Sequence, residues 1–580
     1  MKRKRIVTAL LSVSMLLGLL AGCGGETAAS AGSEAVSEAK EAAAVSTAEA
    51  PKQEEAEKET ASDTESAAEP EEAEEPEHPT LSYPVGDGED TFTMLQVYNP
   101  NASAVYGNEG DYSTAQTYRT LAEKTGVNIQ FKMLAEASFS TQIDLIIASG
   151  DTPDFYGRSL GSYDSKLQAA VEEEVVIDIL PLVEENAPDL YALMEKDPDW
   201  KTKLTNSDGT ICKIASYTLP KTTDGPFIRK DWLDHLGLEA PTDLDSLTNV
   251  LEAFKSEYGC SMPLLLDSDL GSVLDQCFNM QAMGFNFFNF QLDAPNSGKV
   301  ICSLVTDEYI RYLLTLHDYF EKGLITSDFL NISKNAGNLE ACYIDGNSGV
   351  WKDDAKYTYN NAISAREANP EWDAVPFNFD KTDYHMSQAS TAGGVGLTQL
   401  YISANCENPE LALQFVNYAY TDEGALLVQA GEEGLTYTKD ASGKMAYTDL
   451  IIHNPDGWTS SQATYLYLTD AWMPTRQLEE VFEMAYTDDV LAAYDSWTNA
   501  DPGDDSMTIP LDCTLTADEM TEVFTLMADC LSLFSQNAAK VILGDLDEAG
   551  YRAVIDDAMG MGLERITEIY QTAYDRYIEA

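Results

Sequence analysis

The sequence predicts an α/β fold built on a parallel sheet, because strand and helix patterns alternate where the folded part of the chain begins. Residues 91–98 form a plausible first strand. Tyr118, Leu121 and Ala122 then repeat at helical spacing up to Gly126, and residues 127–133 alternate between apolar and polar side chains. This alternation indicates a strand, a helix and a second strand.

A second helix and a third strand follow in the same order. Apolar residues recur at helical spacing between Phe139 and Ile147, and Gly150 supplies a stop signal. Residues 153–156 lead into another short strand. A βαβαβ unit forms a parallel sheet with right-handed crossovers, and ligands bind at the carboxyl ends of its strands.

The folded part, residues 81–580, is too long for a single core, so two or more domains are expected. Its cysteines are scattered, with no CxxC pair, and we expect free, buried thiols while leaving at least one disulfide open. They are Cys212, Cys260, Cys277, Cys302, Cys342, Cys406, Cys513 and Cys530.

The first 22 residues are typical of a bacterial lipoprotein signal peptide. A basic head at residues 2–5 precedes an apolar stretch at residues 6–20, which is too short to span a bilayer stably. Small residues then lead to Cys23, whose thiol is the expected lipidation site. The alternative is a plain signal peptide with an incidental cysteine.

Residues 23–80 are expected to form a disordered acidic tether after the lipidated Cys23. From residue 24 they hold 17 acidic residues against three lysines and no Phe, Trp, Tyr, Leu or Ile. A flexible coil of this length spans about 40 Å on average. The folded part is also strongly acidic within the total charge of −63, which disfavours nucleic acid and anionic lipid as partners.

Two local motifs have direct structural interpretations. Asn408 and Pro409 are an N-cap and a first-turn proline, and the helix that they begin buries a stripe that includes Phe415 and Val416. Residues 439–444 superficially resemble a calcium loop, but no downstream glutamate completes it, so a hairpin turn is expected.

Several segments, in one shared order over residues 90–580, resemble the extracellular solute-binding proteins of ABC sugar transporters. The most similar group is the large lipoprotein branch of the family 1 sugar-binding proteins. The resemblance is carried by residues 121–126 (LAEKTG), 148–154 (ASGDTPD), 227–237 (FIRKDWLDHLG) with 241–242 (PT), 319–325 (YFEKGLI), 402–410 (ISANCENPE), 421–424 (TDEG), 431–437 (GEEGLTY), 539–544 (AKVILG) and 570–574 (YQTAY).

The resemblance implies a two-lobed periplasmic-binding-protein-like fold with an interlobe ligand cleft and a helical C-terminal tail. Lobe 1 would comprise about 85–222 and 388–428, and lobe 2 about 226–385 and 435–580. It implies a monomeric, lipid-anchored protein outside a Gram-positive-type cell that closes on a carbohydrate, first of all an oligosaccharide, and delivers it to the permease subunits. No enzymatic activity, cofactor or metal is expected.

Sugar sites stack aromatic rings on the C–H face of a pyranose and direct polar groups at its hydroxyls. From lobe 1 we select Tyr156, Arg158 and Tyr163, which follow the predicted third strand. From lobe 2 we select Trp351, Asp353 and Asp354.

Candidates of lower weight are Arg229, Trp232, Asn286, Trp458 and Trp472, and Trp232 is as well explained by packing. Gly393, Gly394 and Gly396 would permit a close backbone approach or form a flexible turn.

Other function classes are less well supported by the sequence. Asp353 and Asp354 are adjacent, so on a strand they point to opposite faces and cannot bracket a glycosidic bond well. The sequence contains no HExxH and no GxSxG motif. Internal repeats typical of an adhesin are also absent. A peptide or uronide ligand stays open, because proteins of the resembled family also take such ligands. For a charged uronide, Arg158, Arg229, Lys230 and Lys352 could form the basic pocket that it needs.

Overall fold

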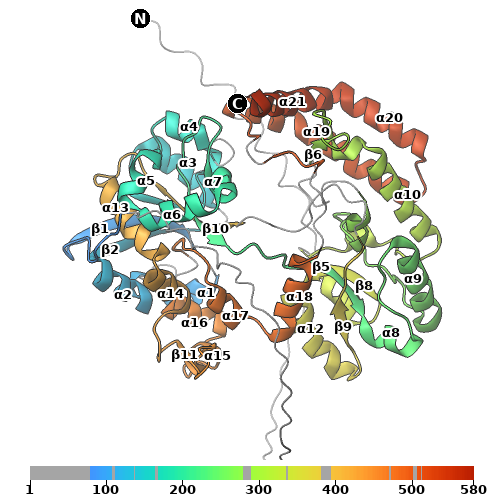
Figure 1. The fold of residues 1–580 in the computed structure, drawn as a ribbon, viewed down its shortest axis with the longest axis horizontal. Coiled ribbons are helices and arrows are strands. Elements are labelled where there is room, and N and C mark those ends of the chain that lie inside the picture. Colours follow the sequence, from blue (N-terminus) through green and yellow to red (C-terminus); the bar gives the residue numbers. More distant parts are fainter. Residues whose placement is uncertain are drawn as a thin grey trace, which may run out of the picture. The chain divides into compact units, whose positions relative to one another are not determined.

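Two main β-sheets, each with its own helices, form the part of the chain that the computed structural model describes (Figure 1). The described residues are 79–98, 100–107, 112–135, 138–163, 167–278, 289–334, 337–380, 394–468, 472–500, 506–510 and 513–579, and they belong to one compact unit. Cys23 and the predicted tether up to residue 78 lie outside them.

The first sheet has the strand order β2-β1-β3-β10-β4. The strands are β1 (Asp90–Val97), β2 (Val127–Leu134), β3 (Phe155–Gly157), β10 (Gly394–Ile402) and β4 (Ile214–Thr218). β1 lies parallel to β2 and β3, whereas β10 is antiparallel to β3 and β4. With α2 (Gln116–Thr125) and α3 (Phe139–Ser149) between the parallel strands, the predicted βαβαβ order is confirmed.

Glycine ends both crossover helices, as the sequence predicts. Gly126 has φ +72° and its N–H donates to the carbonyl of Ala122, while Gly150 has φ +75° and donates to Ile147. A side chain is strained at such angles, so glycine is the favoured C-cap.

Further helices bury the apolar residues of the first sheet. The cap prediction for Asn408 is confirmed, because its side chain accepts a hydrogen bond from the N–H of Leu411, and Phe415 and Val416 are buried. These helices are α1 (Pro100–Tyr106), α4 (Leu167–Glu172), α5 (Leu180–Asn186), α6 (Pro188–Lys196), α7 (Pro198–Leu204), α13 (Pro409–Asn417) and α14 (Asp422–Ala430).

Residues of the described ranges 437–468 and 472–478 pack with the first sheet, whereas the sequence prediction assigned 435–580 to the second lobe. The Tyr106 hydroxyl donates to the carbonyl of Tyr465 at 3.0 Å, and the Trp472 ring lies 5.4 Å from the ring of Phe131. Trp472 therefore belongs to the core of the first sheet, whereas the predicted boundary placed it in the second lobe. The elements are β11 (Tyr437–Lys439), β12 (Met445–Tyr447), α15 (Asp449–Ile452) and α16 (Ser460–Tyr467), followed by α17 (Glu479–Ala485).

The loop between β11 and β12 is a hairpin turn, as predicted. The two strands pair in antiparallel register from Tyr437 opposite Tyr447. One carboxylate oxygen of Asp440 accepts hydrogen bonds from the backbone N–H groups of Ser442 and Lys444, at 2.8 and 3.1 Å. The Asp440 side chain thus closes the turn.

The second sheet has the order β8-β5-β9, with β5 (Asp224–Arg229) antiparallel to both β8 (Val350–Asp354) and β9 (Ala374–Pro376). Leu264 adds a parallel bridge to Val350. Around this sheet lie α8 (Lys230–Leu236), α9 (Leu244–Tyr258), α10 (Asp307–Glu321), α11 (Leu339–Ile344), α12 (Ala355–Ala368) and α18 (Asp488–Thr498).

The C-terminal tail is helical, as predicted. It consists of α19 (Ala517–Ile542), α20 (Glu548–Ala558), a π-helical turn (Met559–Leu563) and α21 (Glu564–Glu579). It shares a core with α10 and with the hairpin of β6 (Phe290–Leu292) and β7 (Val300–Cys302), where the rings of Phe290 and Tyr570 stack at 3.9 Å. The tail thus belongs to the core that includes the second sheet.

Two extended segments run side by side where the chain passes from the first sheet to the second. The N–H of Tyr217 donates to the carbonyl of Thr475, and the N–H of Gln477 donates to the carbonyl of Tyr217. Farther along, the Lys221 ammonium pairs with Glu479 at 3.1 Å and with Asp495 at 3.2 Å. Residues 219–223 then lead directly from β4 into β5.

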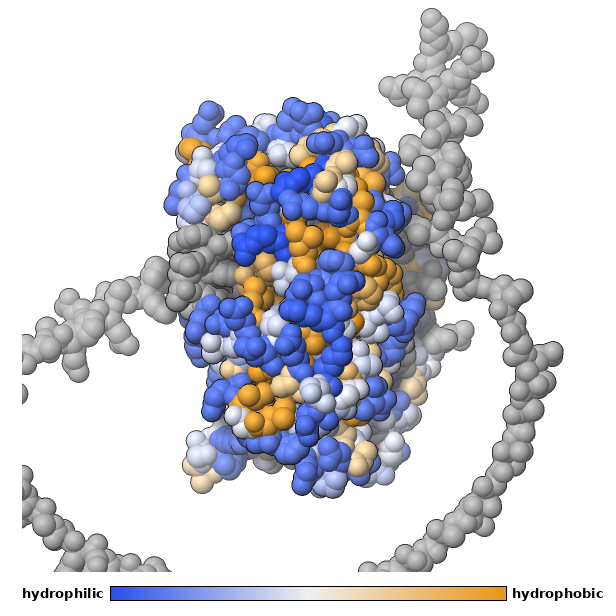
Figure 2. Space-filling model, turned by 90° about the vertical axis from the view of Figure 1, so that its right-hand side faces the viewer, coloured by the Kyte–Doolittle hydropathy of each residue, from blue (hydrophilic) through white to orange (hydrophobic). Residues whose placement is uncertain are grey.

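The described cysteines are all free thiols. Five of them are buried and the other three are half-buried, and burial raises the pKa of the Cys302 and Cys212 thiols. Among the helices within the described ranges, none combines the length and the apolar character that crossing a membrane requires. The face seen in Figure 2, on the side of α8 and α9, is mainly hydrophilic with smaller apolar areas between.

A tight turn at residues 267–271 follows the Leu264 bridge. One carboxylate oxygen of Asp267 accepts hydrogen bonds from the N–H groups of Asp269 and Gly271, at 2.9 and 3.1 Å. These bonds hold Leu270 at φ +58°, and the Tyr312 hydroxyl donates to the Leu270 carbonyl at 2.6 Å. A leucine at positive φ is strained, so this turn is held by its surroundings.

The titration of Asp267 gives a prediction about stability. Burial raises the pKa of Asp267 to about 6, so the folded state binds the proton more tightly than the unfolded state. Its stabilising contribution is present below the unfolded pKa of about 4 and is lost as the pH rises through about 6. We expect wild type to lose on the order of 1–3 kcal/mol relative to Asp267→Asn between pH 4 and pH 7. Urea unfolding of both proteins across that range measures this difference, and parallel profiles would contradict it.

Candidate functional site

A cavity of about 220 Å³ lies at the carboxyl ends of β1 and β3 in the first sheet. Gln96 and Val97 end β1, and Arg158 directly follows β3. β10 and the segment around α16 supply the remaining walls. The lining residues are Gln96, Val97, Arg158, Leu397, Thr398, Gln399, Tyr465 and Trp472. This is the edge of a parallel sheet at which ligands are expected.

Arg158 occupies a strained backbone position at this cavity. Its φ is +75°, although it is not glycine, and its N–H donates to the carbonyl of Gln399 at 2.9 Å. The left-handed conformation costs a residue of this kind about 1–2 kcal/mol. The hydrogen-bonded pairing of β3 with β10 holds the backbone in place. Arg158 itself is exposed to solvent. Strain of this kind is concentrated at functional sites.

Two glutamine side chains supply amide groups to the same cavity. Gln96 is only 3% exposed, and it lies so close to Gly157 that a Cβ there would be 2.1 Å from its Nε2. A glycine at position 157 is therefore needed to leave room for Gln96. The side-chain oxygen Oε1 of Gln399 accepts a hydrogen bond from the Tyr401 hydroxyl at 2.9 Å. Carboxamides both donate and accept, which suits ligand hydroxyl groups.

Aromatic rings form the apolar wall. The Trp472 ring lies 5.3 Å from the ring of Tyr465 and 5.0 Å from that of Tyr112. Beside them Leu397 is 91% exposed, in the part of β10 where the register with β4 shifts. Among the described residues that line it, the cavity thus combines aromatic and aliphatic surface with amides and one cation, and none of these residues carries a carboxylate.

The sequence matches a known family over more than half its length. Residues 116–455 match the family described as bacterial extracellular solute-binding protein. The chain belongs to this family of solute-binding proteins. The resemblance seen in the sequence is thereby confirmed, and so is the expectation of a non-enzymatic protein, because members of the family bind solutes and do not convert them.

Two curated relatives support the same membership. The fructooligosaccharide ABC transporter substrate-binding protein FusA of Streptococcus pneumoniae is 26% identical over 52% of this chain and 56% of its own length. Lipoprotein LipO of Bacillus subtilis is 25% identical over 57% of this chain and 65% of its own length. The match thus spans a little over half to about two thirds of these relatives.

Solved structures show the same fold. The HMO-binding ABC-transporter-associated solute-binding protein of Bifidobacterium longum infantis has a TM-score of 0.65 at 19% identity, over 85% of this chain and 99% of that one. FusA in complex with kestose has a TM-score of 0.58 at 20% identity, over 84% and 100%. The predicted α/β solute-binding fold is therefore confirmed.

Of the residues that the sequence selected in this solute-binding protein, Arg158 and Trp472 line the cavity together. Tyr156 lies in β3 and packs in a core cluster with Leu95 and Tyr401, where its side chain is fully buried. Tyr163 does not line the cavity, and its hydroxyl donates to Glu173 at 2.5 Å, which with burial raises its pKa to about 12. The structure thus offers no exposed face of Tyr156 for stacking.

Of the candidates on β8, Trp351 and Asp353 are fully buried and make structural contacts. Trp351 is fully buried, stacks on Tyr343 at 4.6 Å and donates from its indole N–H to Thr358. No face of the Trp351 ring is left for a sugar.

Asp353 is fully buried, accepts a hydrogen bond from the Tyr343 hydroxyl at 3.1 Å and pairs with the Lys334 ammonium at 2.9 Å. Burial raises its pKa, and the nearby Lys334 opposes that rise. Asp354 caps α12 and accepts from the Tyr494 hydroxyl at 2.8 Å. Neither carboxylate lines the Arg158 cavity.

Arg229 and Trp232 also belong to the second core. Arg229 is 2% exposed, holds Asp231 through two guanidinium nitrogens and lies 4.3 Å over the Trp232 ring. Trp232 stacks on Tyr258 at 4.2 Å. For Trp232 the packing interpretation is the correct one.

The remaining candidates are Trp458, Asn286 and the glycines at the start of β10. Of the seven tryptophans only Trp458 is not buried, and it stays a predicted ligand contact, in the turn before α16. Asn286 and Gly393 lie outside the described residues. Added Cβ atoms at Gly394 and Gly396 would lie 2.2 Å from Thr218 Oγ1 and 2.8 Å from Ser216 Cβ, so the close approach of β10 to β4 is confirmed.

Sequence reasoning missed Gln96, Gln399 and Tyr465. Gln96 ends the first predicted strand, so its position at the carboxyl edge could have selected it. Gln399 and Tyr465 give no such signal, because only tertiary pairing of β10 with β3 and of α16 with α1 brings them to the cavity.

A buried role for Arg229 predicts a large loss of stability on truncation. Removing one partner of a buried ion pair costs about 3–5 kcal/mol, so Arg229→Ala should lower the free energy of unfolding by that amount. The neighbouring exposed pair of Lys230 and Asp234 gives the control, since Lys230→Ala should change stability by about 0.5 kcal/mol or less. An Arg229→Ala protein with wild-type stability in urea unfolding would restore Arg229 as a ligand candidate.

Proposed function

We propose that this protein is the membrane-anchored substrate-binding component of an ABC importer, which captures an oligosaccharide at the Arg158 cavity and delivers it to the permease. The observation that carries the proposal is the meeting of Arg158, two carboxamides and the Trp472 wall at the carboxyl edge of the first sheet. Amides and a guanidinium are suited to a rim of hydroxyl groups, and aromatic surface is suited to a sugar face.

The relatives support a carbohydrate ligand. FusA is named as a fructooligosaccharide-binding component of an ABC transporter, and its solved structure holds kestose. Arg158 is the one charged side chain among the described residues that line the cavity, and a guanidinium also pairs with carboxylates. An oligo-uronide is therefore the second candidate ligand class.

The capture step would be a hinge closure. The first and second sheets have separate cores, and extended segments around Tyr217 and Thr475 connect them. A ligand that contacts both lobes stabilises the closed state by its extra contacts there, and the permease would recognise that state. The exposed Leu397, together with Tyr465 and Trp472, offers apolar surface for such contacts at the first cavity.

The first test is thermal unfolding of the purified chain against neutral oligosaccharides that include kestose, oligo-uronides and short peptides. A ligand that binds only the folded state raises the unfolding midpoint in a concentration-dependent way. A rise with one carbohydrate class, with the sugar recovered intact, is the expected result. A rise with peptides alone would remove the carbohydrate assignment.

Arg158→Asn separates binding from stability. Asparagine tolerates the left-handed conformation, so the unfolding midpoint should stay at or slightly above the wild-type value. Loss of charge-assisted hydrogen bonds should weaken binding of the oligosaccharide found above about 10- to 100-fold in calorimetric titration.

Glu174→Asn is the matched control for Arg158→Asn. Glu174 also has a positive φ, of +57°, and does not line the cavity, so its substitution should leave affinity unchanged. Equal affinities of the two variants would contradict the role of Arg158.

The anchor is tested by Cys23→Ser. Without the thiol the chain cannot be lipidated at this position, so we expect the protein to move from the membrane fraction to the medium. Immunoblotting of both fractions measures the shift, and retention in the membrane fraction would exclude Cys23 as the anchor.

A further inference from the structure

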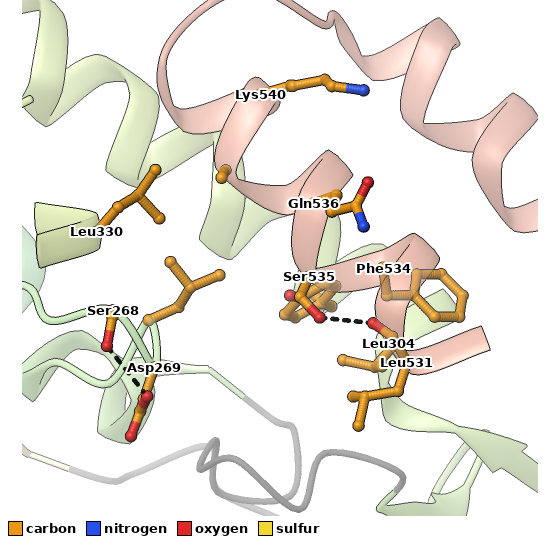
Figure 3. Close-up of a pocket in the computed structure, with 12 residues that line it drawn as sticks. Ser268, Asp269, Leu304, Leu330, Leu531, Phe534, Ser535, Gln536 and Lys540 are labelled. Carbon is orange, nitrogen blue, oxygen red and sulfur yellow. Dashed lines mark hydrogen bonds between the residues drawn. The ribbon is translucent and has the colours of Figure 1, made fainter. Parts of the chain in front are cut away.

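A second cavity, of about 460 Å³, lies in the lobe of the second sheet, between the 267–271 turn and α19 (Figure 3). It shares no lining residue with the Arg158 cavity. Its inner wall is apolar and is formed by Leu270, Leu304, Tyr309, Phe534 and Ala539, all of them buried residues. An apolar cavity of about 150 Å³ accommodates benzene, so this one has room for about three such rings or for an alkyl chain.

The polar groups of this cavity lie at its edge. Ser268 and Asp269 come from the turn, and Gln536 and Lys540 from exposed positions of α19 (Figure 3). The Gln536 amide donates to Ser532 at 2.9 Å, and the Lys540 ammonium donates to Asn537 at 3.0 Å. Among the described lining residues, the carboxylate of Asp269 and the ammonium of Lys540 balance each other, so this rim favours a neutral polar group over an ion.

The strained 267–271 turn lies at the same cavity. Leu270 is the only aliphatic side chain among the described non-glycine residues at positive φ, and it forms part of the apolar wall. The backbone conformation of Leu270 is held by three hydrogen bonds. The N–H groups of Asp269 and Gly271 donate to the Asp267 carboxylate, and the Tyr312 hydroxyl donates to the Leu270 carbonyl. Across the cavity Leu330 is 47% exposed, although a large aliphatic side chain gains by burial. A ligand in the cavity would cover Leu330.

We propose that this second cavity binds a neutral amphipathic molecule, with an alkyl or aryl group inserted between the 267–271 turn and α19 and a hydroxylated head at the rim. The apolar group displaces water from Leu270, Leu330 and Phe534. The head exchanges hydrogen bonds with Ser268, Gln536 and Lys540. The site is independent of the proposed function of the Arg158 cavity, and an alkyl glycoside has the chemistry that it would select.

The test uses β-glucosides of butanol, hexanol and octanol, together with free glucose, each below its critical micelle concentration. In calorimetric titration of the purified chain, affinity should rise about fourfold for each added methylene, because each buried methylene carries a nearly constant hydrophobic gain. Affinity that does not depend on the length of the alkyl chain would overturn the proposal.

Ser535→Trp locates the binding in this cavity. Ser535 is an exposed lining residue on α19, so a tryptophan there should fill the cavity and weaken octyl glucoside binding at least tenfold. Thr525→Trp is the matched control, because Thr525 is also exposed on α19, also donates its hydroxyl to the carbonyl four residues earlier and does not line the cavity. Equal octyl glucoside affinities in these two variants would overturn the proposal.

Two further variants keep the test decisive. Should Ser535→Trp not fold, Leu330→Asn removes apolar surface at the partly exposed rim and should reduce the gain per methylene. Arg158→Asn should leave octyl glucoside affinity unchanged, because Arg158 belongs to the other cavity. Loss of octyl glucoside binding in Arg158→Asn alone would assign that binding to the first cavity and overturn the proposal.

Discussion

The passage of the chain from β4 to β5 is the constraint on which the rest of the structure depends. The backbone N–H of Tyr217 donates a hydrogen bond to Thr475, and its carbonyl accepts one from Gln477. Lys221 adds ion pairs to Glu479 and Asp495. Backbone pairing holds these narrow segments in register, while each sheet keeps a separate apolar core. Two cores joined by few segments can change their relative orientation without breaking either core. The proposed capture mechanism requires this property.

The parts of the fold that could be predicted are those fixed by local pattern. Periodicity, the glycine C-caps and the Asn408 cap act within a few residues, so the βαβαβ unit and its helices follow from the sequence. The placement of residues 437–478 could not be predicted in this way. Trp472 joins the first core by packing on Phe131 and Tyr112, more than 300 residues earlier, and no local signal records that contact.

The candidate site was predictable to the extent that topology places it. Arg158 was found because it follows a strand of the parallel sheet, and Trp472 because its ring suits a sugar. The same reasoning from residue type selected Trp351 and Trp232, which are buried. A large ring serves a core and a sugar site equally well, and only burial distinguishes the two. Gln399 depends on strand pairing over more than 200 residues, which periodicity does not reveal.

Small-angle X-ray scattering of residues 79–580, with and without the oligosaccharide that raises the unfolding midpoint, tests the central claim most directly. Closure of two lobes about the Tyr217 connection would decrease the radius of gyration at saturating ligand, and Arg158→Asn would need a higher ligand concentration for the same decrease. An unchanged radius of gyration at a concentration that saturates binding would contradict capture by hinge closure.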